Sequence, residues 1–182
     1  MVITVYTDRR SSDVADVALR LAHALSAIVA PAGVVLLGPR PHGGADSAVQ
    51  HAPLAESSSP GDIGALLTDL ETRYAAAVVP LAGPPTEQVL AAFDASDRLL
   101  LVSDPSVASM RGTQRTLKLC RSLGYDLART AVVLHDFDDA PIAPTDAALA
   151  FKREIFWTLP GRSASPDERD AAYAGLARRL IG

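Results

Sequence analysis

The chain has 182 residues, of which 48% are hydrophobic and 21% are charged. This length and apolar content are enough for a single domain, residues 1–182, with a well-buried core. The formal net charge of -4 excludes a broad electrostatic attraction to polyanions, so we expect no specific nucleic-acid partner.

Short apolar runs, rich in Val and Leu and without polar alternation, are typical of strands buried on both faces of a parallel sheet. In chain order they are Val2–Tyr6, Gly33–Leu37, Ala75–Leu81, Arg98–Val102 and Thr130–Leu134. Helical patterns alternate with these runs, at Asp13–Val29, Pro60–Tyr74, Thr86–Asp94, Ser106–Leu123 and Pro166–Ile181. The alternation predicts an α/β fold with a three-layer, doubly wound, mainly parallel sheet and helices on both of its faces.

Two stretches show no sustained period. The segment 39–60 is rich in Pro, Gly, Ser and His, which predicts a long loop. Residues 136–146 form a second irregular stretch, and Ile155–Leu159 has the length of a short sixth strand or an edge segment. No internal repeat and no shift in composition marks a second domain.

The rarer residue types exclude several kinds of site. Cys120 is the one cysteine, so neither a disulfide framework nor a cysteine metal site can form within the chain. The histidines His23, His42, His51 and His135 have no metal-ligand spacing, so we expect no metal. No apolar run approaches the roughly 20 residues of a transmembrane helix, and no signal peptide is present. We therefore expect a cytoplasmic protein without a transmembrane segment, and the Ala-, Arg- and Pro-rich usage indicates a bacterial source.

The loop after the first strand carries the strongest indication of a site. It reads Thr7-Asp8-Arg9-Arg10-Ser11-Ser12-Asp13. Such a loop usually binds an anion, because N–H groups converge at the N-terminus of the following helix. Arg9 and Arg10 supply charge for an anion or a partner's carboxylate. The loop lacks the glycines and the Gly-Lys-Ser/Thr ending that cradle a triphosphate. Ser11 and Ser12 are expected to cap the helix, since no G-x-S-x-G elbow surrounds them.

The helical segment Ser106–Leu123 has a basic face opposite its apolar side. The basic residues are Arg111, Arg115, Lys118 and Arg121. A solvated helix face is the simplest interpretation, and binding of an acidic partner or of lipid headgroups is the alternative.

The passage 95–111, which reads ASDRLLLVSDPSVASMR, resembles a strand-to-helix passage of the MinD/ParA superfamily of deviant P-loop ATPases. The similarity is greatest to the MinD-like branch that includes TadZ and CpaE. Residues 119–125 and Thr130–Leu134 follow as the next helix and strand of that family do. The resemblance extends with gaps over nearly the whole chain and implies a P-loop NTPase-like fold.

The nucleotide-binding motifs of that family are absent where the resemblance places them. Val14 and Ala15 stand at the positions of the phosphate-binding lysine and the magnesium-binding hydroxyl. His135 stands at the position of a base-contacting asparagine. The carboxylates that follow the second and third strands of the family are missing from residues 37–42 and 78–85. The phosphate loop is therefore degenerate.

Phosphoryl transfer depends on lysine, magnesium and backbone amides arranged around the phosphates. Their joint loss predicts a non-hydrolysing pseudo-ATPase that is not an enzyme, holds no cofactor, and acts in interaction, localisation or regulation. Arg9 stands at the family's signature lysine, which crosses to the other subunit of a dimer, so the resemblance implies a protein partner: a second copy or a related true ATPase. The alternative is a protein that reuses the old pocket to bind a small anion or nucleotide through Arg9, Arg10, Arg40 and His135.

Overall fold

A computed structural model describes residues 1–9, 13–29, 33–38, 49–53, 58–137, 140 and 142–182. Within these residues seven strands form one parallel sheet in the order β3-β2-β4-β1-β5-β6-β7. The strands are β1 (Val2–Thr7), β2 (Val34–Leu37), β3 (Val49–Ala52), β4 (Ala76–Ala82), β5 (Arg98–Ser103), β6 (Thr130–His135) and β7 (Trp157–Leu159).

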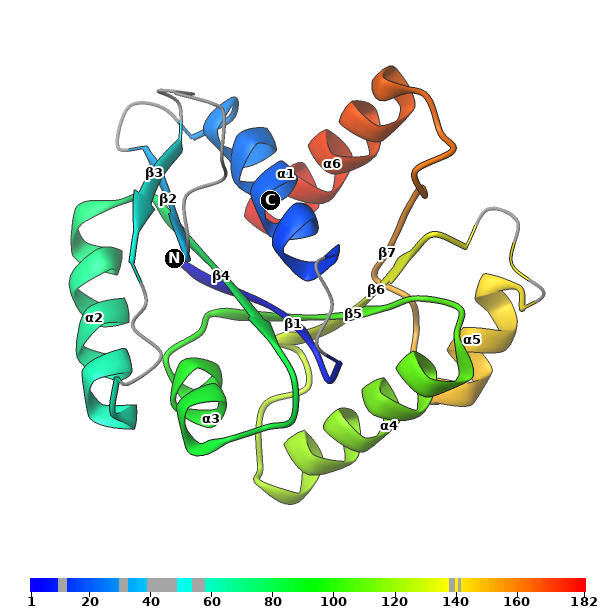
Figure 1. The fold of residues 1–182 in the computed structure, drawn as a ribbon, viewed down its shortest axis with the longest axis horizontal. Helices are drawn as coiled ribbons and strands as arrows, with labels where there is room; N and C mark the ends of the chain where they lie inside the picture. Colours follow the sequence, from blue (N-terminus) through cyan, green and yellow to red (C-terminus); the bar gives the residue numbers. More distant parts are fainter. Residues whose placement is uncertain (10–12, 30–32, 39–48, 54–57, 138–139, 141) are drawn as a thin grey trace.

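Helices cover both faces of this sheet (Figure 1). One face carries α1 (Asp13–Ser26) and α6 (Pro166–Ile181), which pack against each other. The opposite face carries α2 (Pro60–Arg73), α3 (Glu87–Asp94), α4 (Val107–Ser122) and α5 (Pro144–Phe151). The expected three-layer α/β arrangement is confirmed.

The side chains of β1 point alternately to the two faces of the sheet and pack under both layers of helices. Ile3 and Val5 are fully buried in the cluster that includes α1 and α6. Val2 belongs to the cluster under α2, and Tyr6 to the cluster under α3 and α4. Because successive strand residues point to opposite faces, one buried strand contributes to both cores.

Polar contacts fix the start of β1 within this apolar surrounding. The Val2 amide donates to the carboxylate of Asp97 over 2.7 Å. The hydroxyl oxygens of Thr4 and Ser96 lie 2.6 Å apart and are both buried. Ser96 also donates to the carbonyl oxygen of Ala92 in α3. These buried hydroxyl groups are hydrogen-bonded, which offsets the cost of removing them from water while they join β1 to the α3–β5 turn.

Two helices begin at capping boxes that the sequence contains in full. Ser59 accepts from the Asp62 amide, and the Asp62 carboxylate accepts from the Ser59 amide. Ser165 and Glu168 make the same exchange at the start of α6. The hydrogen bonds lower the pKa of both carboxyl groups, because they favour the charged form. A proline follows each cap and supplies a preset φ for the first turn.

Two elements differ from the sequence-based expectations. The predicted loop 39–60 contains the edge strand β3, in which only Val49 is buried, and a strand of this kind has no clear apolar period. The helix α5 was not predicted, because it follows an irregular stretch and buries only Ala147 and Phe151. Its N-cap Ala143 provides no side-chain hydrogen bond that would indicate a helix start. The short sixth strand is present as β7.

None of the helices in the described part of the chain is long and apolar enough to cross a membrane.

The packing of α6 on β7 allows no side chain at Gly175. A Cβ atom there would lie 2.5 Å from Cζ2 of the Trp157 ring, whose Nε1 donates to the carbonyl oxygen of Ala172 over 3.0 Å. In the interior of α2, a Cβ atom at Gly64 would meet nothing within 4 Å.

We expect Gly175→Ala to lower the free energy of unfolding by about 1–3 kcal/mol, because the methyl group displaces a packed indole ring. The matched control Gly64→Ala should raise it by about 0.5–1 kcal/mol, since alanine restricts the unfolded chain. Urea denaturation followed by circular dichroism measures both. Stabilisation by both substitutions would contradict the close contact between α6 and β7.

Candidate functional site

The sheet has a topological switch point between β1 and β5. The chain leaves β1 through α1 toward β2 on one side, and leaves β5 through α4 toward β6 on the other. The carboxyl ends of the two strands therefore open into a crevice, which is where open α/β sheets bind their ligands. The loop after β1, for which the sequence predicts an anion site, begins at this place with Asp8 and Arg9, and the site itself stays a prediction.

A small cavity lies in this crevice. The cavity lies between the starts of α1 and α4, with His135 at one side. The space that the described residues leave there is about 20 Å³. A single water needs about 10–15 Å³, whereas pockets for small organic ligands usually have about 300–1,000 Å³. The cavity lined by the described residues is thus large enough for about one water molecule.

Acidic side chains occupy the N-terminus of α1. Asp13 is the first residue of the helix, and its Oδ1 lies 3.1 Å from Nη2 of Arg162 in the loop before α6. Asp16 in the same turn pairs with Arg20 over 3.0 Å. Carboxylates at this end of a helix complement its macrodipole in the way that a bound phosphate would. The helix therefore carries its own anions at the position where this fold presents an anion site.

Val14 provides no charge toward the crevice. Its side chain is 4% exposed and belongs to the core under α1 and α6. The position at which the resemblance implies a lysine is thus occupied by a side chain that contributes to packing.

Arg9 reaches the next helix across the crevice. Its Nη1 donates to Oγ of Ser106 over 3.2 Å. Ser106 is the N-cap of α4 and accepts from the Ser109 amide, while its own amide donates to Asp104. Arg9 therefore joins the end of β1 to the start of α4 in an exposed position.

Asp8 makes the contact that sequence reasoning missed. Its Oδ2 lies 2.8 Å from Nη2 of Arg115 in α4, and its side chain is only 13% exposed. It packs on Gly112, where a Cβ atom would lie 2.8 Å from that oxygen. The glycine one turn before Arg115 on a basic helix face was the available signal, because a helical glycine often marks a close approach. The expected basic face is thus partly used inside the chain.

His135 ends β6 beside the crevice, and Asp136 follows it directly. His135 is half-buried and lines the small cavity. Asp136 has a left-handed backbone with φ of 62°, a region that aspartate tolerates better than most residues. Its carboxylate fills the space that a Cβ atom of Gly161 would occupy, so the loop after β7 closes directly on the end of β6. Any side chain at residue 161 would therefore collide with this carboxylate.

Of the six residues expected to form the anion site, the structure describes only Arg9 and His135. Arg9 and His135 both lie at the carboxyl edge, but Arg9 is bonded to Ser106 and is not part of the cavity wall. Arg10, Ser11, Ser12 and Arg40 lie outside the described residues. Within the described ranges, no three His, Cys, Asp or Glu side chains are grouped so that they could hold a metal ion.

Tyr6 holds the loop that follows β4 near the crevice. Its hydroxyl donates to the carbonyl oxygen of Gly83 over 2.7 Å, and its ring packs edge-on against Phe93 at 5.1 Å. Burial, reinforced by the charge of Asp8, raises the pKa of Tyr6 to about 12. The loop after β4, from which the carboxylate implied by the family resemblance is missing, is therefore held by a neutral phenol.

Comparison with known proteins gives no match to any family model and no match to any curated protein. Solved structures are similar. A ParA family ATPase from Chlorobium tepidum TLS has a TM-score of 0.83 at 14% identity, covering 98% of this chain and 98% of that chain. The MinD cell division protein of Aquifex aeolicus has a TM-score of 0.78 at 14% identity, covering 100% and 97%. MinD in a MinC:MinD complex from the same organism has a TM-score of 0.78 at 15% identity, covering 100% and 95%.

At these identities the similarity shows the fold alone. The expected MinD/ParA-like, P-loop NTPase-like fold is confirmed over essentially the full length of the chain. The narrower similarity to the TadZ and CpaE branch stays a prediction.

We expect Tyr6→Phe to lower the free energy of unfolding by about 1–3 kcal/mol at pH 7, since the Gly83 carbonyl loses its buried partner. A raised pKa in the folded state means that the protonated phenol stabilises the fold fully below pH 10 and that this stabilisation is lost as the pH rises toward 12. Wild-type stability should therefore fall over that interval, and the variant should show a smaller fall. Burial also raises the pKa of Tyr125 and of Tyr173. These two residues account for the smaller fall in stability that we expect in the Tyr6→Phe variant.

Urea denaturation across this pH range measures the difference. Tyr74→Phe is the control, because the Tyr74 hydroxyl bonds to Gln50 at the surface. Equal pH profiles for wild type and Tyr6→Phe would contradict the assigned role of Tyr6.

Proposed function

We propose that this chain, which has the fold of the MinD/ParA ATPases, is a non-hydrolysing pseudo-ATPase that acts by binding a protein partner, either a second copy of itself or a related true ATPase. The observation that carries the proposal is the Asp13 carboxylate at the first turn of α1, paired with Arg162. It places negative charge at the helix end where the fold otherwise receives phosphate.

Electrostatics support the absence of hydrolysis. Two like charges about 4 Å apart near a protein surface repel by about 4 kcal/mol. Loss of one preorganised stabilising group in an active site typically costs about 10²–10³ in rate. Here an acid is present and the lysine position holds buried Val14. Both effects act against a bound triphosphate and its transition state.

The surface at the start of α4 supports a role in binding. Val107 is 59% exposed, a large apolar side chain beside the Arg9–Ser106 contact. Arg111 on the next turn adds an exposed basic group. An apolar side chain next to exposed arginine is typical of the composition of protein interfaces. One of the similar structures is MinD in complex with MinC, and we propose a comparable use of this fold here, first with a second copy of the chain.

We expect isothermal titration with ATP and magnesium to show no binding with a Kd below about 1 mM. Phosphate release from ATP should equal that of a buffer blank, because no lysine or hydroxyl group stands at the catalytic positions of the loop. Micromolar binding together with turnover would overturn the proposal. A rise in melting temperature with a phosphate compound that Arg9→Ala abolishes would instead favour anion binding in the old pocket.

We expect Val107→Glu to weaken self-association at least about tenfold, since a charge placed in a desolvated contact is not compensated. Leu123→Glu is the matched control at the far end of α4, where the side chain is also exposed, at 51%. Sedimentation equilibrium over a range of concentrations measures both. A wild-type protein that is strictly monomeric at high concentration, or equal effects of the two substitutions, would contradict an interface at this surface.

A further inference from the structure

One helix of this acidic chain carries positive charge alone. Every charged residue of α4 is basic, although the whole chain has a net charge of -4. These residues are Arg111, Arg115, Lys118 and Arg121, and we call them the α4 basic row. All of them are exposed. Because helical side chains three and four residues apart are neighbours on one face, the row forms a continuous positive surface.

Few carboxylates oppose the row. Arg115 pairs with Asp8, whose Oδ2 lies 2.8 Å from its Nη2. In the part of the chain that the structure describes, no carboxylate lies within ion-pair distance of the side chains of Arg111, Lys118 or Arg121. Like charges four residues apart weaken a helix, so the row does not stabilise the fold. Its charge is therefore left for a partner.

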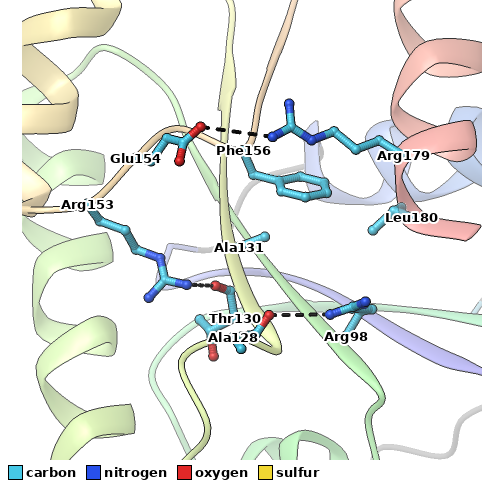
Figure 2. Close-up of a pocket in the computed structure, with 9 residues that line it drawn as sticks. All are labelled: Arg98, Ala128, Thr130, Ala131, Arg153, Glu154, Phe156, Arg179 and Leu180. Atoms are coloured by element: carbon cyan, nitrogen blue, oxygen red, sulfur yellow. Dashed lines mark hydrogen bonds and ion pairs between the residues drawn. The ribbon is translucent and has the colours of Figure 1, made fainter. Parts of the chain in front are cut away.

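Other arginines of the chain differ, because the fold itself uses them. A cavity of about 230 Å³ at the amino ends of β5, β6 and β7 is lined by Arg98, Arg153 and Arg179. Figure 2 shows their guanidinium groups apart, each turned to a different partner. Carbonyl oxygens accept from Arg98 and Arg153, and Arg179 stacks on Phe156. These three side chains brace the chain and do not form one binding surface.

The helix that carries the row is held firmly on the fold. Its inner side contributes Met110, Leu117 and Cys120 to the core. The helix α5 packs beside it, and Nε2 of Gln114 donates to the carbonyl oxygen of Ala150 over 2.9 Å. The row is thus fixed in place before a partner arrives, which reduces the entropy lost on binding.

The surroundings of the row favour an acidic protein segment over a membrane or a nucleic acid. The apolar side of α4 is buried in the core, so the helix cannot insert it among lipid chains. Binding to duplex DNA depends on many phosphate contacts, whereas one helix face supplies few cations. Carboxylates suit the row better, because a guanidinium group can bind one through two parallel hydrogen bonds.

We infer that the α4 basic row binds an acidic helical segment of another protein, whose carboxylates pair with Arg111, Lys118 and Arg121. The row extends over about 15 Å at 1.5 Å per residue, so about three turns of a partner helix would cover it. Carboxylates three and four residues apart on that helix would match the spacing of the row. The inference goes beyond the proposed self-association at Val107, because it concerns the later turns of α4 and does not depend on the loss of ATP hydrolysis.

Fluorescence anisotropy with a labelled peptide at constant ionic strength tests the inference. The probe is a peptide of Ala and Glu with Glu at three- and four-residue spacing, about 15 residues long because shorter helices are marginal in water. The control peptide has Gln in place of each Glu. We expect saturable binding of the acidic peptide that Lys118→Glu weakens at least about tenfold, since like charges then meet.

Arg178→Glu is the matched control variant. It changes the net charge equally at an exposed position of α6, on the opposite face of the sheet (Figure 1). We expect it to leave the affinity for the peptide nearly unchanged. Both variants should keep the wild-type melting temperature, and Lys118→Gln replaces Lys118→Glu if that variant is less stable.

Amide chemical shifts in NMR spectra locate the bound peptide, and we expect the changes to centre on residues 111–121. No saturation, equal affinity for the Gln peptide, or equal weakening by the two substitutions would each overturn the inference. Binding to duplex DNA or to vesicles containing phosphatidylserine that is at least as tight would also overturn it, because the row would then serve another class of polyanion. ATP titration and the Val107→Glu variant test the proposed function separately, so the two can fail independently.

Discussion

The structure depends on β1, a strand that is paired on both edges and covered on both faces. Its backbone bonds to β4 on one side and β5 on the other. Ile3 and Val5 pack under α1 and α6, and Tyr6 packs under α3 and α4. A strand whose backbone groups are hydrogen-bonded on both edges and whose side chains are packed on both faces has one stable position. Any shift would leave buried backbone groups without hydrogen-bond partners. The loop that leaves β1 is thereby fixed beside β5, which is why Asp8 and Arg9 reach α4.

Charged side chains at the carboxyl edge pair with one another across the loops of the chain. Asp13 pairs with Arg162 and Asp8 with Arg115, while Arg9 donates to Ser106. Exposed pairs of this kind contribute about 0–1 kcal/mol each, so they have little influence on the stability of the fold. Among the described residues at this edge, the guanidinium groups of Arg9, Arg115 and Arg162 thus already have partners in the chain.

The two edges of the sheet thus differ in what their arginines contact. At the carboxyl edge Arg115 and Arg162 face carboxylates, whereas at the amino edge Arg98 and Arg153 bond to neutral carbonyl oxygens. A carbonyl oxygen orients a guanidinium without neutralising it. The arginines of the two edges thus differ in their partners although they belong to one sheet, in agreement with the rule that a fold does not by itself assign a function.

The sequence alone determined most of the alternating strands and helices and the absence of glycine and lysine from the loop after β1, because both are local features. Buried Val and Leu runs, capping pairs such as Ser165 and Glu168, and the absence of glycine and lysine after β1 can all be read over a few residues. It gave no signal for β3 or α5, which bury too few side chains to show a period. Only the tertiary structure decided which charges meet. Asp13 and Arg162 are 149 positions apart, and Asp8 and Arg115 are 107 apart. Such pairs form because the sheet brings distant loops to one edge, and no local pattern encodes that proximity.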